Sequence, residues 1–66
     1  MKNNLKVLRA IANISQADLA DKIQVSRQTI NAMEKGKYVP STVLALKLSV
    51  FFKKPVEEIF QLEDGD

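Results

Sequence analysis

The chain has 66 residues, a length that suits one domain, with ten Lys and Arg against eight Asp and Glu and with no cysteine or histidine. The missing residue types exclude disulfides and thiolate metal sites, and they remove the commonest general base and zinc ligand together. We therefore expect neither an enzyme nor a bound metal or cofactor. No apolar run approaches the ~20 residues that span a bilayer, and no signal-peptide layout is present, so we expect a cytoplasmic protein.

The first helical pattern runs from Leu5 to Ala12. Asn4, directly before it, is a good N-cap residue because its side chain can accept a hydrogen bond from a free backbone N–H of the helix. Leu5, Leu8 and Ala12 recur at helical spacing. We expect these three side chains to face the core.

Two short helical patterns follow, separated by a tight turn at Gln24 and Val25. The first opens at Ser15, and Asp18 three residues later makes a short-armed capping box with it. The apolar side chains of this helix fall on one face: Leu19, Ala20 and Ile23.

The second of the two patterns opens at Ser26, another good N-cap residue. At about 100° per residue, Ile30 and Met33 lie on one side of this helix. The long polar side chains share the other side: Arg27, Gln28, Asn31 and Lys35. Gly36 follows where a left-handed residue commonly ends a helix. The sequence thus predicts a helix with one core face and one hydrogen-bonding face.

A fourth helix, capped by Ser41, has an inner stripe of five apolar side chains: Leu44, Ala45, Leu48, Phe51 and Phe52. Val43, Leu46 and Val50 make most of its remaining surface apolar, which predicts burial on several sides. A short fifth helix begins at Pro55, and its apolar end needs a partner surface: Ile59, Phe60 and Leu62.

The segment from 14 to 36 resembles the helix-turn-helix of the lambda repressor/Cro-type (XRE) family of bacterial and phage regulators. Gln16 matches the family's Gln at the start of the first motif helix, and Ala20 matches its small mid-helix residue. The apolar positions of the motif match at Leu19, Ile23, Val25, Ile30 and Met33. Tyr38 to Ser41 match the family's loop-Pro-Ser start of a fourth helix, and the resemblance extends from about Leu5 to Phe60. One departure is Gln24, where the family often has Gly and where a left-handed Gln costs about 1 kcal/mol or more.

The resemblance implies an all-α, five-helix lambda-repressor-like DNA-binding domain with the motif at 16–35. It also implies an ion pair between Arg9 in the first helix and Glu34 near the end of the recognition helix. Some compact members add a small antiparallel sheet made from the two chain ends. Residues 1–4 and 61–64 are just long enough for such a sheet here.

If the third helix enters a DNA major groove, its N-terminal residues approach base edges first. Arg suits the two acceptors of guanine, and Gln or Asn suits the donor–acceptor pair of adenine. The resemblance assigns base contacts to Arg27, Gln28, Asn31 and, less regularly, Ala32, which can touch only a thymine methyl. The alternative for these polar side chains is a solvated helix face that reads nothing.

Phosphate contacts are expected from helix N-termini and flanking side chains, where backbone N–H groups and a positive dipole face an anion. The candidates are Gln16, Thr29, Lys35, Lys37, Ser41 and Thr42. Ser15 and Ser26 are interpreted as caps alone, whereas Ser41 is a candidate for both roles.

Charge is distributed unevenly along the chain. Residues 1–56 carry all ten basic side chains and three acidic ones, a net charge of +7, whereas residues 57–66 carry five acidic side chains and no basic one. A basic body attracts a polyanion, and an acidic tail must point away from it or be compensated by another chain. The alternative is a solvated surface with a disordered acidic end.

Together these features predict a sequence-specific DNA-binding transcriptional regulator, a repressor that binds a pseudo-palindromic operator as a homodimer. The dimer surface is expected in the segment from about 50 to 64, at Val50, Phe52, Val56, Ile59, Phe60 and Leu62. The alternative is an antitoxin or adaptor that uses the same fold to bind a partner protein. No small-molecule ligand is expected.

Overall fold

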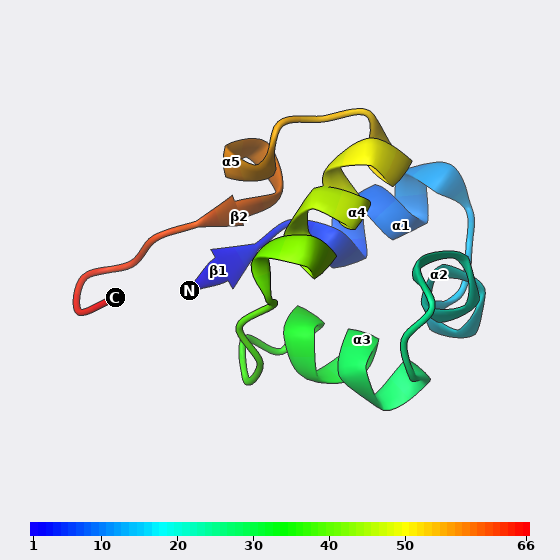
Figure 1. The fold of residues 1–66 in the computed structure, drawn as a ribbon, viewed down its shortest axis with the longest axis horizontal. Helices are drawn as coiled ribbons and strands as arrows, with labels where there is room; N and C mark the ends of the chain where they lie inside the picture. Colours follow the sequence, from blue (N-terminus) through cyan, green and yellow to red (C-terminus); the bar gives the residue numbers. More distant parts are fainter.

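The computed structural model describes residues 1–66 and contains five helices and one two-stranded sheet (Figure 1). In chain order the elements are β1 (Lys2–Asn3), α1 (Leu5–Ala12), α2 (Gln16–Ile23), α3 (Arg27–Glu34), α4 (Thr42–Phe52), α5 (Val56–Ile59) and β2 (Phe60–Gln61). The expected five-helix fold and the terminal sheet are therefore both confirmed. No helix of the protein has the length and apolar character needed to cross a membrane.

The sheet brings the two ends of the chain together, as Figure 1 shows. β1 and β2 are antiparallel, with Lys2 opposite Gln61 and Asn3 opposite Phe60. The side-chain amide of Asn3 also donates to the backbone O of Met33 at 2.7 Å. The sheet is thereby attached to the C-terminal end of α3.

Eleven apolar side chains form one buried cluster to which all five helices contribute. Six of them are essentially inaccessible to solvent: Leu5, Leu19, Ile30, Met33, Leu48 and Ile59. Ala12 is exposed and not part of this cluster, so the expected inner face of α1 is correct only for Leu5 and Leu8.

The outer side of α4 differs from its sequence pattern. Leu44 and Leu48 are buried, but Val43, Leu46 and Val50 are 64%, 54% and 78% exposed. The prediction that α4 is buried on several sides is therefore wrong for a single chain. With five short helices there is too little protein to cover more than one face of α4.

Local hydrogen bonds fix the start of each motif helix. Ser15 Oγ accepts from Asp18 N at 3.0 Å and Asp18 Oδ2 accepts from Ser15 N at 3.2 Å, so the capping box at α2 is complete. Ser26 Oγ accepts from Thr29 N at 3.1 Å, which caps α3. The Asn4 side chain caps nothing, because its amide donates to the backbone O of Glu58. Instead, Asn3 Oδ1 accepts from Leu5 N at 3.1 Å.

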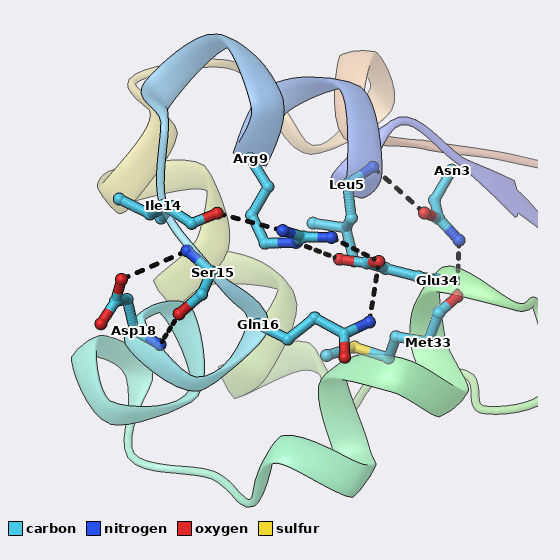
Figure 2. Close-up of polar contacts among 9 residues, drawn as sticks. All are labelled: Asn3, Leu5, Arg9, Ile14, Ser15, Gln16, Asp18, Met33 and Glu34. Carbon is cyan, nitrogen blue, oxygen red and sulfur yellow. Dashed lines mark hydrogen bonds and ion pairs between the residues drawn. The ribbon is translucent and has the colours of Figure 1, made fainter.

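A polar network fixes α3 relative to α1 and α2 (Figure 2). Arg9 Nε and Nη2 donate to the two carboxylate oxygens of Glu34 at 2.6 and 3.1 Å, and Arg9 Nη1 donates to the backbone O of Ile14 at 3.0 Å. Gln16 Nε2 donates to Glu34 Oε1 at 3.1 Å. The side chains of Arg9 and Glu34 are only 16% and 6% exposed. Because both charges are largely removed from water, each needs the other to offset the cost of its desolvation.

The backbone conformation of Gln24, in the turn between α2 and α3, suggests a substitution that would stabilise the protein. Gln24 ends α2 with φ 61° and ψ 47°, the left-handed conformation that a side chain disfavours. Gln24→Gly should raise the free energy of unfolding by up to about 1 kcal/mol, whereas Gln24→Val should lower it because a β-branched residue tolerates this conformation poorly. Urea unfolding followed by circular dichroism measures both effects. A Gly variant less stable than the Val variant would contradict this account of the turn.

Removing Glu34 should destabilise the fold severely. Glu34→Ala leaves the Arg9 guanidinium half-paired and largely buried, at a cost of ~3–5 kcal/mol, which is comparable with the whole stability expected for a domain of this size. Thermal denaturation of this variant is to be compared with that of Glu57→Ala, which removes an exposed carboxylate from α5. Equal melting temperatures for both variants would show that the pair does not hold the helices.

The same pair predicts a loss of stability in acid. Burial raises the pKa of Glu34, but hydrogen bonds from Arg9 and Gln16 and the charge of Arg9 lower it further than burial raises it, so the net pKa lies below the usual 4.5. A depressed pKa in the folded state contributes stability above the unfolded pKa, and that stability is lost as the pH falls through the folded pKa. The free energy of unfolding should therefore decrease below about pH 4.5, with a shallower slope in Glu34→Gln. Urea unfolding at pH 3 to 6 tests this, and parallel slopes would argue against it.

Candidate nucleic-acid interface

The outer face of α3 carries the side chains that the sequence singles out for base reading. Ile30 and Met33 anchor the inner face in the core, with no exposed surface. Arg27 and Gln28 are exposed at the N-terminal end of the helix, and Asn31 is partly exposed one turn later. In Figure 1, α3 forms the lower edge of the molecule, and no other element covers its outer side. The helix is therefore free to approach a ligand along this edge.

Ala32 is partly buried, like Asn31, whereas Arg27 and Gln28 are exposed. Its carbonyl accepts from Lys37 N at 2.9 Å while Met33 O accepts from Gly36 N at 2.9 Å. These bonds close the C-terminal end of α3, where Gly36 has φ 73°. Gly36 is thus the left-handed residue that the sequence predicts at this place.

The expected phosphate contacts fall into two groups in the structure. Lys35 and Lys37 are exposed in the segment after α3, and Ser41 and Thr42 are exposed at the start of α4. Ser41 Oγ accepts from Leu44 N at 3.2 Å, which leaves the amides of Thr42 and Val43 at an uncovered helix N-terminus. This group can offer both ammonium and backbone N–H donors to an anion.

Two other phosphate candidates already have partners within the chain. The amide nitrogen of Gln16 donates to Glu34, as described above, and Thr29 Oγ1 lies 2.8 Å from Ser26 Oγ. Gln16 can still offer an N–H group, because the first backbone amides of α2 have no partner within the helix. The part that Gln16 plays in the α1–α3 network was missed by the sequence reasoning, since nothing in the pattern links residues 16 and 34.

The acidic end of the chain lies away from the N-terminal end of α3. Figure 1 shows the C-terminal segment at the left beside the N-terminus, whereas α3 begins at the right, where α2 ends. The carboxylates of Glu63 and Asp66 lie 3.0 and 3.2 Å from the amine of Met1. The negative segment therefore does not cover Arg27 or Gln28.

The residues expected between two copies divide into buried and exposed sets. Ile59 and Phe60 are 0% and 7% exposed within one chain, so they are core residues and offer almost no surface to a second copy. Val50 and Leu62 are largely exposed, and Phe52 and Val56 are partly buried. The physical reason is the length of α5. A helix this short is stable only with tertiary support, and α5 finds that support by packing its apolar side against α4 of its own chain.

No three His, Cys, Asp or Glu side chains are grouped so that they could hold a metal ion. One hollow on the surface has a volume of about 510 Å³ and is lined mainly by apolar side chains of α4 and the end of α2. It includes none of the base-reading candidates. The polar face of α3 is thus separate from the apolar face of α4.

A family model described as helix-turn-helix matches residues 5–59. Over all 66 residues and its full length, an uncharacterized HTH-type transcriptional regulator from Methanocaldococcus jannaschii is 56% identical to this chain. The uncharacterized HTH-type transcriptional regulator YgzD of Bacillus subtilis is 48% identical over 97% of both chains. A third such protein, from Archaeoglobus fulgidus, is 41% identical over the whole of this chain and 93% of its own length.

The capped α2–turn–α3 unit, the anchored inner face of α3 and the uncovered polar face agree with these matches along most of the chain. The resemblance to lambda repressor/Cro-type proteins rested on the same segment. The chain therefore belongs to the helix-turn-helix family of DNA-binding regulators.

Proposed function

We propose that the protein is a sequence-specific transcriptional repressor that acts in the cytoplasm and inserts α3 into the DNA major groove. The observation that carries the proposal is the division of α3 into an inner face held by Ile30 and Met33 and an outer face with Arg27, Gln28 and Asn31. A helix fixed in this way can offer its side chains to base edges without losing contact with the core. The relatives named as HTH-type transcriptional regulators support the coarser part of this proposal, a role in transcriptional regulation.

The three polar side chains suit particular base edges. Arg27 can donate two hydrogen bonds to N7 and O6 of a guanine, and Gln28 or Asn31 can pair with N6 and N7 of an adenine. Ala32 can contribute only an apolar contact to a thymine methyl. The proposed positioning contacts with phosphate are those of Gln16, Thr29, Lys35, Lys37, Ser41 and Thr42.

A homodimer on a pseudo-palindromic operator follows from the small size of the reading surface. Three side chains on one eight-residue helix read only a few base pairs, which is too little for selectivity in a genome. A twofold pair places two such helices one turn of DNA apart, about 34 Å, and doubles the sequence that is read. A pair bound at a promoter excludes RNA polymerase by occupying the same DNA, so repression requires no further surface.

The alternative is an antitoxin or adaptor that binds a different protein. The exposed apolar side of α4 favours it, since such a surface on a soluble chain commonly marks an interaction site. This alternative leaves the outer face of α3 without a role, and we therefore prefer the repressor.

Base reading and phosphate binding predict different mutant behaviour. Arg27→Ala and Gln28→Ala should each cost about 1–3 kcal/mol on the specific operator and relax one base position. Lys37→Ala should weaken binding to specific and random DNA alike and reduce the salt slope by about one unit. The measurement is a gel shift on the DNA upstream of the protein's own gene, at several salt concentrations.

A matched control for Lys37→Ala is Lys54→Ala, in the loop between α4 and α5, which Figure 1 shows at the edge opposite α3. It removes the same charge from the chain and should change binding little. Equal losses on operator and random DNA for Arg27→Ala, Gln28→Ala and Lys37→Ala would remove the reading role from α3.

A further inference from the structure

The outer side of α4 carries an apolar stripe that the single chain leaves uncovered. Val43, Leu46 and Val50 are spaced three and four residues apart and therefore line one face of the helix. Val39, in the segment before α4, is also 68% exposed. We call these four side chains the α4 stripe.

The α4 stripe lies between two apolar hollows. One, of about 510 Å³, lies between α4 and the end of α2. Ile23 and Phe51 contribute apolar side chains to its lining, and Lys22, Gln24 and Lys47 lie at it as well. The other, of about 270 Å³, lies between the start of α4, the preceding segment and α5, and Val39 and Val56 contribute to it. Leu46 lines both hollows. One face of the molecule thus presents a ridge, the α4 stripe, beside two hollows that can receive such a ridge.

This combination suits a second copy of the same chain. In a twofold contact the same patch occurs on both sides, so the patch must be complementary to itself. Helices pack by placing the ridge of side chains on one into the groove beside the other. A face with both features can meet its own copy without any other partner.

We propose that a second copy docks on this face, with the α4 stripes of the two chains in contact and Leu46 near the twofold axis. The proposal rests on the proposed homodimer and specifies its interface. It moves the centre of that interface from the C-terminal segment to α4.

The other exposed apolar side chains are less suited to form an interface with a second copy. On α1, Val7 and Ile11 are exposed, but neither lines a hollow. Leu62 is 79% exposed, but it lies in the C-terminal segment, where its neighbours Glu63 and Asp64 are polar and no apolar groove adjoins it. Of these surfaces, the α4 face is the one that combines an exposed apolar stripe with adjoining hollows.

A stable pair needs only a moderate share of the surface of this chain. A typical interface buries about 800 Å² on each partner, which is less than a fifth of the 4523 Å² surface of this chain. The α4 stripe alone is too small for that, but the two hollows extend the face from the end of α2 to α5. A stable contact would therefore involve the apolar residues of both hollows as well as the α4 stripe.

The position of the face also suits two half-sites. A separation of about 34 Å between recognition helices places each α3 roughly 17 Å from the twofold axis. The two shorter dimensions of the chain are 23 and 21 Å. α2 packs against both α3 and α4, so an axis at the outer surface of α4 lies within one molecular thickness of α3.

Substitutions on the stripe test the proposal against a control of equal exposure. Val50→Glu and Leu46→Glu place a charge on an exposed helix position, so the single chain should keep its helix content by circular dichroism. Each should raise the dissociation constant of the dimer by about 100-fold, measured by sedimentation equilibrium, because a carboxylate would replace an apolar contact in the interface. Ile11→Glu, at a side chain 76% exposed against 78% for Val50, should dimerise like the unsubstituted protein.

A crosslinking experiment provides a positive result. The chain has no cysteine, so a Leu46→Cys variant carries a single thiol. Two such thiols near the axis can approach to the ~5–6 Å between Cα atoms that a disulfide needs. Mild oxidation should give a covalent dimer from Leu46→Cys and little from Ile11→Cys, as seen on a non-reducing gel.

The outcomes separate this inference from the proposed function. Dimerisation of Val50→Glu and Leu46→Glu as tight as that of the unsubstituted protein, with no crosslink through Leu46→Cys, would overturn the α4 interface and leave the repressor in place. A dimer with the expected interface that prefers no DNA sequence would overturn the repressor only. An unsubstituted chain that remains monomeric with and without operator DNA would overturn both, and binding of a different protein to the stripe of that monomer would favour the adaptor.

Discussion

The position of α3 depends on one ion pair that is largely shielded from solvent. Arg9 projects from α1, Glu34 ends α3, and the same guanidinium reaches the carbonyl of Ile14 in the segment that leads into α2. Gln16, the first residue of α2, completes the set through Glu34 (Figure 2). Three helices are therefore oriented by hydrogen bonds around one carboxylate, while Leu5, Leu19 and Ile30 exclude water on the apolar side. In a core of eleven side chains, such directional contacts have a large share in choosing one arrangement.

α3 combines two roles in eight residues because of its periodicity. Ile30 and Met33 face the core, and Arg27, Gln28 and Asn31 face outward, so the side chains that anchor the helix are not those proposed to read bases. The N-cap is provided by Ser26, whose bond to Thr29 leaves the long side chains of the first turn free. At the other end, Gly36 closes the helix, and Lys35 and Lys37 remain exposed beside it. The residues that fix α3 in the fold are thus different from the residues that α3 exposes to solvent.

Much of the fold followed from local sequence features. Serine caps at 15, 26 and 41 and the apolar positions of α2 and α3 gave helices within one or two residues of those observed. The ion pair and the terminal sheet came from a family resemblance, because nothing in the spacing of residues 9 and 34 or in the chain ends indicates a contact. The part played by Gln16 in the pair and the attachment of Asn3 to the end of α3 were not foreseen, since both connect residues far apart in the chain.

The sequence by itself determined where the helices begin and end and which side chains face outward on α3, because caps and periodicity act over three or four residues. Only the tertiary structure decided which apolar side chains are covered. Ile59 and Phe60 lie in the core of one chain, whereas Val43, Leu46 and Val50 remain at its surface, and the hydrophobic pattern reads the same for both sets. An apolar side chain favours burial, but the packing of elements distant in the sequence determines whether its own chain covers it.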